Sequence, residues 1–582
     1  MMTPAQRRLV WITAILVALT RIVAASRSLW DWDEAQFASA LHDFDVAAHH
    51  PHPPGFPLFI ALAKIVQLLG VSDFHALQAV TIAGAIALFP LMFWLGRELG
   101  FSFSTAYFAA LLLAFSPNVW FFGGTAFSDV PSLALSLLAC ALLLRGRTSP
   151  SAYLLGALAL GFAAGFRPQN LLIGFAPALL ATWHRRSFKQ TLAAIVIGAS
   201  TIAAAYGGAV VATGDWGTYR DAVRSHQRYI AQIDSWRSPL HPGLVRVADD
   251  FFVRPYRFEK FNVTLTAFAV LGLLAAIVRR RKPLLLALAI FGPFWIVAWL
   301  MLDFNSVSRF SIAWMPLVAF AAACGIAFVA RKPLVEYALA LGLVGWMIYL
   351  TAPAIAIVRA NDSPPVRAIQ WIRTHVPKDS VLHVHGSMGP YADLLLSDYR
   401  QERWVEKLPD ARDGWILQEG ATSLAPEIRN FTYPHNNLWN IARHRYFEVS
   451  VRPLAAQATF GDGWYDEEGE GELTWRWMGA RAFVYLRPMN GNARLELRFV
   501  VPRDILPAAP NITLTWNGQV LDRIRGDQQF FERSYVVASR PDAQNELRIE
   551  TDRVANPAKQ GIFDDSRDLG VRLERIGWRA VR

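Results

Sequence analysis

The sequence is poor in charged residues and in cysteine. Asp, Glu, Lys and Arg make up 18% of the 582 residues, against about 25% in soluble globular domains. This shortage excludes an ordinary water-soluble protein over most of the chain and favours a membrane protein. The two cysteines, Cys140 and Cys324, each lie inside an apolar run. They indicate neither a disulfide framework nor a metal site, and they do not report the redox compartment.

Several signatures of nucleotide-dependent and hydrolytic enzymes are also missing. The sequence contains no P-loop, no glycine-rich dinucleotide fingerprint and no persuasive Ser-His-Asp pattern. Its formal net charge of +11 could suggest a nucleic-acid partner. The basic residues, however, punctuate apolar runs and form no stripe. They are therefore interpreted as topology signals, and no nucleic acid is expected to bind.

What the sequence does contain, up to about residue 358, is a series of apolar runs. A membrane-spanning helix needs about 20 mostly apolar residues. A further run, 56–70 ("FPLFIALAKIVQLLG"), is shorter and has Lys64 in its middle. Because a central lysine costs about 2.5–3.5 kcal/mol on insertion, this run is interpreted as an amphipathic helix in the membrane interface. The candidate spans lie at 9–25, 77–95, 103–120, 129–145, 151–167, 170–183, 190–212, 261–278, 283–302, 309–330 and 333–356.

Basic clusters between these runs predict the orientation of the chain. If 56–70 does not span, all six clusters fall on one side, which the positive-inside rule makes the cytoplasm. The sequence then predicts eleven spans, a cytoplasmic N-terminus and a C-terminal part on the outer side. The clusters are Arg7/Arg8, Arg97, Arg145/Arg147, Arg185/Arg186/Lys189, Arg279 to Lys282, and Arg331/Lys332.

Beyond residue 358 the composition becomes that of a water-soluble protein. Residues 359–450 mix helix-like and strand-like pieces and predict a small α/β domain. In residues 451–582 period-two runs dominate, with "NG" as a turn signal, and predict an antiparallel β-sandwich. The predicted fold is a polytopic α-helical membrane domain at 1–358, followed by these two extracytoplasmic domains.

An acidic stretch, "SLWDWDEAQFASALHDF", follows the first apolar run. It places Asp33 and Glu34 at the outer membrane edge, close to Trp30 and Trp32. A partly buried carboxylate there has a tunable pKa and could take a proton from an incoming hydroxyl group. The alternative is helix capping, since acids favour the first turn of a helix. Capping is preferred for Asp31, and the functional interpretation for Asp33.

Three further polar residues lie at the outer ends of predicted helices. Asp129, in "FSDVPSL", fits a helix cap and a functional role equally well. Arg167 and Arg309 are cations suited to binding phosphate. The alternative for each arginine is contact with lipid headgroups. Because these residues and "DWDE" share one level of the membrane, the pattern predicts an active site at the interface.

Four of the thirteen histidines are close together in the sequence: His42, His49, His50 and His52. No helical i, i+4 pair with a carboxylate is evident, and prolines interrupt the stretch. A metal site is therefore the minority interpretation. For His52, in "HPPGFP", orientation of a phosphate or carboxylate is favoured.

The order of these pieces resembles the GT-C membrane glycosyltransferases. The resemblance is carried by "WDWDEAQFASAL", "HPPGFPLFIALAKIVQLLG", "WLGRELG" and "LLLAFSPNVWFFGGTAFSDVPSLALSLL", within about residues 9–200, and later by "SRFSIAWMPLVAF". The branch that it looks most like contains protein O-mannosyltransferases and lipid A aminoarabinose transferases. Together with the short loops, that branch favours the bacterial inner (plasma) membrane, with the C-terminal part periplasmic or extracellular.

The resemblance implies roles for individual residues. Asp33 matches the family's catalytic acidic residue, with Glu34 beside it, and Asp129 matches a second acid. His52 matches the loop before the interfacial helix, and Arg309 matches a donor-phosphate contact.

Three positions depart from the family pattern. Arg167, in "FRPQN", replaces a commoner lysine-containing turn and is carried over as a further phosphate contact. Gly55 stands where members often have a bulky residue, and Phe37 replaces the usual tyrosine.

The chemistry implied by the resemblance is sugar transfer from a polyprenyl-phosphate donor to a hydroxyl of a lipid, glycan or protein acceptor, with the donor tail among membrane lipids. Asp33 would be the general base of a direct displacement that inverts the anomeric carbon. A divalent metal is left open, with Glu34 and His52 as candidate ligands, and no other cofactor is implied.

The C-terminal stretch "FGDGWYDEEGEGELTWRWMGARAFVYL" looks like modules attached to sugar-handling enzymes. Trp464, Trp475 and Trp477 are candidate platforms for stacking on sugars. Packing of these aromatic rings within the protein is the default interpretation, because large aromatic side chains dominate protein cores.

Two other functions compete with the enzyme. A transporter or flippase of lipid-linked sugars would use the same membrane domain, but transporters tend to carry ionisable residues at mid-membrane, whereas here they lie at helix ends. A non-catalytic surface protein would bind sugar through residues 451–582 alone.

Overall fold

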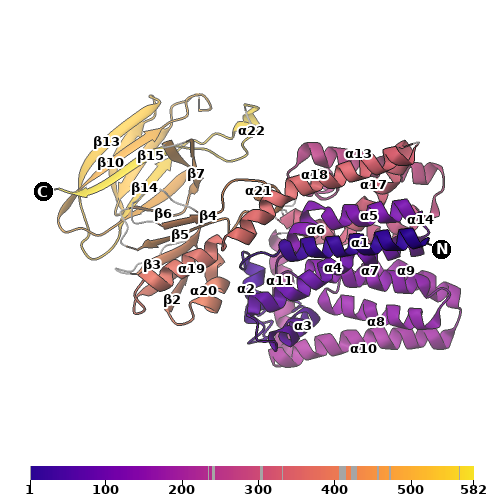
Figure 1. Ribbon diagram of the computed structural model, residues 1–582. Coiled ribbons are helices and arrows are strands. Elements are labelled where there is room, and N and C mark those ends of the chain that lie inside the picture. The colour runs from indigo at the N-terminus through magenta and orange to yellow at the C-terminus, as the bar shows by residue number, and fades with distance from the viewer. Residues whose placement is uncertain are drawn as a thin grey trace. The chain divides into compact units, whose positions relative to one another are not determined.

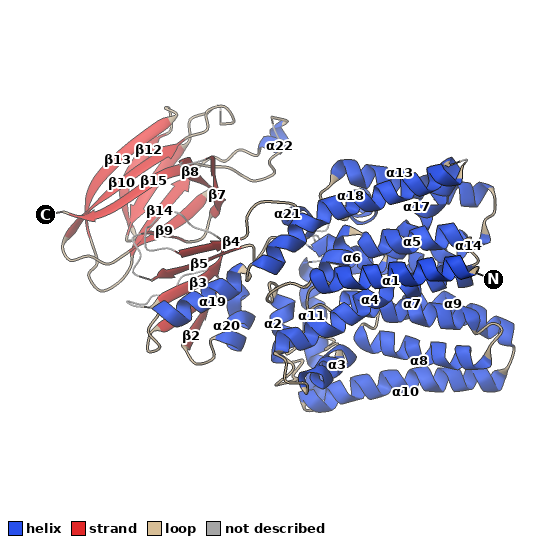
Figure 2. Cartoon of the chain, in the orientation of Figure 1, coloured by secondary structure: helices blue, strands red, loops and turns tan. Residues whose placement is uncertain are grey.

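The structure is a computed structural model that describes residues 2–233, 235–238, 243–301, 306–330, 332–405, 414–420, 429–454, 458–470, 473–506, 508–562 and 564–581. The chain forms two compact units. The helical unit consists of Met1–Asp362 and Pro434–His444, and the second unit of Ser363–Tyr433 and Arg445–Arg582. Figure 2 shows that the named strands belong to the second unit.

Helices lie at all eleven predicted apolar segments, and the predicted polytopic α-helical fold is confirmed. Among the described residues, α4, α10, α13, residues 282–300 and α18 are long and apolar enough to cross a membrane; a sixth span results if residues 307–313 and α17, bent by 73°, count as one. The helices are α1 (Pro4–Val23), α4 (Asp73–Leu99), α5 (Phe103–Phe115), α6 (Pro117–Phe122), α7 (Asp129–Arg145), α8 (Pro150–Phe166), α9 (Asn170–Arg185), α10 (Phe188–Thr213), α13 (Glu259–Val278), α14 (Lys282–Phe291), η2 (Gly292–Phe294), α15 (Trp295–Met301), α16 (Val307–Phe310), η4 (Ser311–Ala313), α17 (Met315–Val329) and α18 (Pro333–Ala360).

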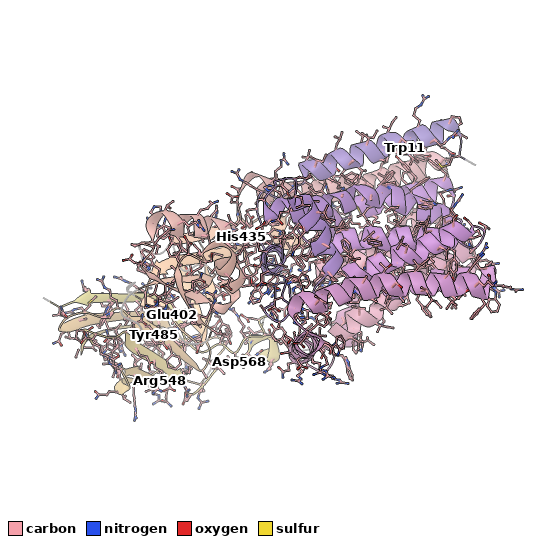
Figure 3. The ribbon with its side chains drawn as sticks, turned by 90° about the horizontal axis from the view of Figure 1, so that it is seen from below. Trp11, Glu402, His435, Tyr485, Arg548 and Asp568 are labelled. Atoms are coloured by element: carbon pink, nitrogen blue, oxygen red, sulfur yellow. The ribbon has the colours of Figure 1, made fainter. Side chains whose placement is uncertain are left out.

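The outward surface of the helical unit is rich in apolar side chains. Trp11 on α1 is 70% exposed, and Figure 3 shows it at the rim of the unit. Val211 on α10 and Leu334 on α18 are also exposed. Soluble monomers rarely expose apolar surface on this scale, so the surface fits contact with lipid.

Local sequence signals set the ends of several helices. Ser72 is the N-cap of α4 and accepts a hydrogen bond from His75 N–H. Gly100 ends that helix in a left-handed conformation with φ +94°, which glycine adopts without steric cost. Pro117 separates α5 from α6, since proline cannot continue the hydrogen-bond ladder of α5.

Helix α3 (Pro57–Gln67) is the run predicted to lie in the interface. Its 11 residues extend about 16 Å, about half of a bilayer's hydrocarbon thickness. Phe59 and Ile60 are buried against the unit, whereas Ile65 is 61% exposed. Helix α3 is therefore too short to cross a membrane. The segments that carry α2, α3 and α11 lie at the end of the helical unit opposite the N-terminus, as Figure 1 shows.

Two short elements and one returning segment complete that end of the unit. Helix α2 (Trp32–Ser39) follows α1, and α11 (Trp216–Ile233) follows α10. Residues 434–444, which contain α21 (Leu438–Ile441), return from far downstream in the sequence. Figure 3 labels His435 in this segment.

Hydrogen bonds fix residues 434–444 in the helical unit. The Asn437 side chain donates to the Leu350 carbonyl in α18 at 2.9 Å. The Arg257 N–H donates to the Asn440 carbonyl at 2.8 Å. The sequence did not predict this return, because its contacts are formed with residues about 90 and 180 positions away.

The second unit begins with a mixed sheet in the strand order β2-β1-β3-β5-β4. Strand β1 pairs in parallel with β2 and β3, while β5 runs antiparallel to β3 and β4. Helices α19 (Pro364–His375) and α20 (Gly389–Leu395) belong to the same part of the chain. The strands are β1 (Val381–His385), β2 (Arg400–Trp404), β3 (Trp415–Glu419), β4 (Arg429–Thr432) and β5 (Glu448–Pro453).

Two five-stranded sheets follow, in the orders β13-β10-β15-β8-β7 and β12-β11-β14-β9-β6. Leu495, Leu497 and Ile549 belong to their buried core. Asn517 and Gly518, the predicted "NG" turn, have φ +49° and +85° between β11 and β12. The predicted β-rich C-terminal fold is confirmed. The strands are β6 (Ala458–Phe460), β7 (Trp464–Glu470), β8 (Leu473–Met478), β9 (Arg481–Leu486), β10 (Asn492–Val500), β11 (Asn511–Trp516), β12 (Gln519–Arg525), β13 (Phe530–Ala538), β14 (Asn545–Thr551) and β15 (Arg572–Ala580).

Candidate active site

The sequence "DWDE" folds as a capping box at the start of α2. The Asp31 carboxylate accepts a hydrogen bond from Asp33 N–H at 3.1 Å. The Glu34 side chain reaches back and accepts from Trp30 N–H at 2.6 Å and from Asp31 N–H at 3.2 Å. An acid at the N-cap and another three residues later is the usual pattern of this motif. The expectation that Asp31 is a cap is confirmed.

Glu34 also joins α2 to the joint between α6 and α7. Its second oxygen accepts from Ala126 N–H at 2.8 Å, and the side chain is fully buried. Burial raises the pKa of Glu34 to about 8, although hydrogen bonds from the three backbone N–H groups oppose the rise. Both carboxylate oxygens therefore face backbone amides, and Glu34 holds the backbone around Asp33.

Four charged side chains form a buried network at this end of the helical unit. Arg309 Nη1 lies 2.6 Å from Asp33 Oδ2, and Arg309 Nε lies 3.8 Å from Asp129 Oδ2. Arg167 Nη2 lies 2.9 Å from the same Asp129 oxygen. Each of the four side chains is at most 18% exposed. The structure thus brings together four residues that the sequence had singled out separately.

Asp129 and Arg167 meet because they occupy the ends of neighbouring helices. Asp129 is the first residue of α7, and Arg167 is the C-cap of α8. Ser128, the N-cap of α7, makes no capping hydrogen bond with its side chain. Its hydroxyl instead accepts from Arg167 Nε at 3.1 Å. Asp129 therefore serves as an ion-pair partner of Arg167.

Arg309 is fixed by aromatic and hydrogen-bond contacts around α16. Its guanidinium lies 4.6 Å from the centre of the Phe127 ring. The Asn118 side chain donates to the Ser308 carbonyl at 2.8 Å and to Ser311 Oγ at 2.9 Å. The Ser308 hydroxyl donates to the Ile441 carbonyl of the returning segment. The Arg309 side chain is 12% exposed and lies among these contacts within the helical unit.

His52 lies beside Asp33 in the loop before α3. Its Nδ1 is 2.9 Å from Gln36 Oε1 and 3.7 Å from Asp33 Oδ1. Because an amide oxygen only accepts, Nδ1 carries a proton. Burial lowers the pKa of His52 to about 4, against the opposing charge of Asp33. His52 is therefore neutral at pH 7 and can act as a hydrogen-bond group more readily than as a cation.

The same loop explains one departure from the family pattern. Gly55 has φ +101°, and a Cβ added there would lie 2.8 Å from a Val46 methyl group. A larger residue would be strained in this conformation and would displace Val46.

Asp33 is held in its ionised form. Burial by itself would raise the pKa of Asp33, but the charge of Arg309 and a hydrogen bond from Arg309 hold it below its usual range. A carboxylate in this state is a weak base as long as Arg309 stays paired with it.

Two further charged or titratable residues at the site were missed by the sequence reasoning. The His226 ring on α11 lies 5.9 Å from that of His49 and 5.8 Å from that of His52. Arg443, at the end of the returning segment, places a positive charge that favours the ionised forms of Asp31 and Asp33. No local sequence signal identifies either residue, because both reach the site through long-range packing.

The remaining histidines of the cluster point elsewhere. His42 Nε2 lies 2.7 Å from Asp73 Oδ2, and His50 Nδ1 lies 3.6 Å from Asp43 Oδ2. Within the described part of the chain, no three His, Cys, Asp or Glu side chains are arranged to hold a metal ion.

The three tryptophans singled out as sugar platforms make contacts within the second unit. Trp464 donates to the Phe483 carbonyl at 2.8 Å and packs against the sandwich core. The Arg572 guanidinium lies 4.8 Å from the Trp475 ring centre and 5.6 Å from that of Trp477. These contacts follow the default interpretation of packing, and sugar binding by the three rings stays a prediction.

Comparison with known proteins matches part of the chain to a family. Residues 51–206 match the family described as dolichyl-phosphate-mannose-protein mannosyltransferase. No curated protein sequence matches. The matched range contains His52, Asp129 and Arg167, whereas Asp33 and Arg309 lie outside it.

Several solved structures are also similar. Arabinosyltransferase EmbB from Mycobacterium smegmatis has 13% identity and a TM-score of 0.39, over 99% of this chain and 65% of that one. The archaeal oligosaccharyltransferase AglB from Archaeoglobus fulgidus, with an inhibitory peptide and a dolichol-phosphate, has 12% identity and a TM-score of 0.43, over 69% and 65%. ArnT from Cupriavidus metallidurans has 11% identity and a TM-score of 0.47, over 78% and 98%.

The chain therefore spans about two thirds of the length of EmbB and AglB. The resemblance to membrane glycosyltransferases is confirmed by the family match, which covers residues 51–206.

Proposed function

We propose that this protein is an integral-membrane glycosyltransferase that moves a sugar from a polyprenyl-phosphate donor to a hydroxyl acceptor. The family match over residues 51–206 supports the class of reaction. The buried network of Asp33, Arg309, Asp129 and Arg167 supports the location of the site. The basic joints at the opposite end of the helices support a cytoplasmic N-terminus, with the site and the second unit on the periplasmic or extracellular side of the inner membrane.

The single observation that carries the proposal is the position of Arg309 between two carboxylates. A guanidinium binds phosphate strongly through paired hydrogen bonds. The contact of Arg309 with Asp129 is the longest in the network, at 3.8 Å. Arg167 stays on Asp129 at 2.9 Å and adds positive potential. Arg309 is therefore the group that contacts the donor phosphate, with the polyprenyl tail among the lipids.

Donor binding activates Asp33 in this account. When the phosphate engages Arg309, it neutralises the charge that holds the pKa of Asp33 low, so Asp33 becomes a stronger base. Asp33 then takes the proton of the acceptor hydroxyl while that oxygen attacks the anomeric carbon. The bond between the sugar and the phosphate breaks, and polyprenyl phosphate leaves with its charge stabilised by the arginines. One direct displacement inverts the anomeric carbon.

Of the two residues left open as metal ligands, Glu34 uses both oxygens as acceptors of backbone hydrogen bonds. His52 donates through Nδ1 to Gln36. No step of the proposed reaction is assigned to a metal. In this proposal Glu34 positions Asp33, and His52 is a neutral side chain beside it.

Transfer of radiolabelled sugar tests the proposal. A panel of polyprenyl-phosphate sugars is incubated with membrane extract and purified protein, either wild type or Asp33→Asn. We expect label in a product with wild type alone, and its chemistry will identify a lipid, glycan or protein acceptor. Size-exclusion chromatography and thermal unfolding show whether the variant folds. Undiminished transfer by folded Asp33→Asn would contradict the role of the base. Movement of lipid-linked sugar across proteoliposomes, without any transfer, would favour a flippase.

A further inference from the structure

Helix α11 is amphipathic, and its inner face packs on the loop that carries His52. The Tyr219 hydroxyl donates to the Pro54 carbonyl at 2.9 Å. The His226 ring lies 5.8 Å from that of His52, and Val223 packs in the apolar cluster that contains Tyr219. Figure 1 shows α11 at the same end of the helical unit as α2 and α3. The inner face of α11 is therefore occupied by the unit itself, while its outer face is exposed.

The outer face of α11 carries three exposed arginines at a spacing of four residues, Arg220, Arg224 and Arg228. Like charges at this spacing are neighbours on a helix surface and destabilise the helix. Asp221, the one acid of the helix, pairs with Arg220 at 3.0 Å. Arg224 and Arg228 form no hydrogen bond or ion pair within the described part of the chain. The described residues thus leave positive charge on this face without a partner.

Neither membrane topology nor solubility accounts for these arginines. The basic clusters that predict the orientation of the chain belong to the end that contains the N-terminus, whereas α11 lies at the opposite end. Solubility is served by charges of both signs placed among one another. Arg246, which follows α11 in the chain and is 75% exposed, has such an arrangement and pairs with Asp250 at 3.4 Å. The unpaired arginines of α11 suit an anion from outside the chain.

Aromatic side chains accompany the arginines on α11. Trp216, four residues before Arg220, is 63% exposed, and Tyr229, next to Arg228, is 56% exposed. Trp and Tyr are enriched where a membrane meets water, because one part of each ring system is apolar and another is polar. A soluble phosphate would give these exposed rings no apolar contact. Arginines together with exposed aromatic rings therefore favour the surface of a lipid bilayer over a soluble anion.

We propose that the outer face of α11 binds the headgroups of anionic phospholipids through Arg220, Arg224 and Arg228, with Trp216 and Tyr229 at the level of the headgroups. A guanidinium binds phosphate through paired hydrogen bonds, and anionic membrane surfaces attract clustered arginines. Because α11 packs on the loop that carries His52, bound lipid holds this helix at the candidate site. The inference adds a lipid-binding surface and does not depend on sugar transfer.

Quenching of Trp216 by brominated lipids tests the inference on the full-length protein in neutral detergent. The probes are phosphatidylglycerol and zwitterionic phosphatidylcholine with the same brominated acyl chains. The signal of Trp216 is the difference in fluorescence between each protein and the same protein with Trp216→Phe. We expect phosphatidylglycerol to quench wild type at a lower mole fraction than phosphatidylcholine does.

Two sets of substitutions on α11 separate the arginines from the rest of the helix. The triple variant combines Arg220→Gln, Arg224→Gln and Arg228→Gln. It should bind phosphatidylglycerol at least about tenfold more weakly than wild type, since each arginine at an anionic surface contributes about fivefold. The matched control combines Gln227→Ala and Gln232→Ala, at exposed positions of the same helix, and should bind both lipids as wild type does.

Thermal unfolding separates lipid binding from a role of the arginines in folding. The triple variant removes repulsion along α11, so without phosphatidylglycerol it should unfold at no lower temperature than wild type. Phosphatidylglycerol should raise the unfolding temperature of wild type more than that of the triple variant, because a ligand stabilises the folded state that it binds. A triple variant that is less stable without lipid and is stabilised equally by phosphatidylglycerol would show a structural role and overturn the inference.

Three other results would also overturn the inference. Equal quenching of Trp216 by phosphatidylglycerol in wild type and in the triple variant would show that these arginines do not bind the headgroup. If that result came with loss of sugar transfer, the arginines would belong to an anionic acceptor. Equal quenching of wild type by the two lipids would show contact without recognition of charge. Displacement of phosphatidylglycerol by an equal concentration of glycerol 3-phosphate would assign the face to free phosphate. None of these results bears on Asp33→Asn, which tests the proposed transfer separately.

Discussion

The two ends of the helical unit use arginine in different ways. At the end that contains the N-terminus, the Arg145 side chain is 59% exposed and pairs with Glu98 at 3.2 Å. At the other end, Arg309 is 12% exposed and pairs with Asp33 at 2.6 Å. An exposed ion pair contributes about 0–1 kcal/mol, whereas a buried guanidinium is stable only with its partners. An arginine that is buried beside a carboxylate, such as Arg309, belongs to the candidate site. An exposed arginine, such as Arg145, belongs to the basic clusters that predict the orientation of the chain.

The largest effect on sugar transfer is expected from a substitution of Arg309. Arg309→Gln removes the proposed phosphate contact and leaves Asp33 buried without its closest partner. We expect sugar transfer to fall about 100-fold or more, as for loss of one preorganised charge in other enzymes. Arg145→Gln is the matched control and should change the initial rate less than about twofold. Equal transfer rates for the two variants, at equal amounts of folded protein, would contradict a role of Arg309 in catalysis.

A second effect compares Glu34, which is fully buried, with Glu98, which is 17% exposed. At a pH above about 8, where Glu34 is ionised, Glu34→Gln replaces one accepting oxygen by an NH₂ group that must face backbone N–H donors. We expect the free energy of unfolding to fall by about 1–3 kcal/mol. Glu98→Gln weakens an ion pair whose arginine, Arg145, is 59% exposed, and it should cost less than about 1 kcal/mol. Thermal unfolding in detergent measures both. If Glu34→Gln lowers the free energy of unfolding no more than Glu98→Gln does, the hydrogen bonds of Glu34 do not stabilise the fold as proposed.

A smaller effect tests whether the hydrogen bond between Ser308 and the returning segment positions Arg309. Ser308→Ala removes the hydroxyl that donates to the Ile441 carbonyl, while Ser308→Thr keeps a hydroxyl. We expect Ser308→Ala to raise KM for the donor about tenfold with little change in kcat, because Arg309 is displaced from the phosphate position. Ser308→Thr should restore most of the affinity. Loss of kcat alone, or no rescue by threonine, would show that Ser308 does not position Arg309.

The smallest effect is a pH dependence that comes from His52. Its pKa is about 4 in the folded protein against 6.5 when unperturbed. Between these values the unfolded chain binds one more proton, so this residue's contribution to stability decreases as the pH falls from 6.5 to 4. Unfolding of wild type should therefore become easier across this window more steeply than that of His52→Gln. Parallel pH profiles for the two proteins would contradict the burial of a neutral His52.

Local features of this chain could be predicted from the sequence. The spacing of Asp31 and Glu34 in "DWDE" gives a capping box because the two side chains need only their own helix turn. The shortness of the apolar run and the charge of Lys64 predict that α3 does not cross the membrane. The "NG" turn needs two residues that tolerate positive φ. In each case the determining contacts lie within a few residues.

Features that depend on distant contacts could not be predicted. The hydrogen bond from Ala126 N–H to Glu34, a candidate catalytic residue, supports a positioning role for Glu34, and nothing near Glu34 in the sequence predicts this contact. His226 and Arg443 reach the site from α11 and from the returning segment. The pairing of Arg309 with Asp33 joins residues from the first and last thirds of the helical unit, so only the packed structure identifies it.

The central claim is that Arg309 is shared between Asp33 and the donor phosphate, and one binding measurement tests it directly. The affinity of a short-chain polyprenyl phosphate is measured for wild type and for Asp33→Asn in detergent. Because Asp33→Asn removes the charge that competes for Arg309, we predict that the variant binds the phosphate about threefold to tenfold more tightly, although it transfers no sugar. Unchanged or weaker binding by a folded Asp33→Asn protein would contradict the claim that Asp33 and the phosphate share this arginine.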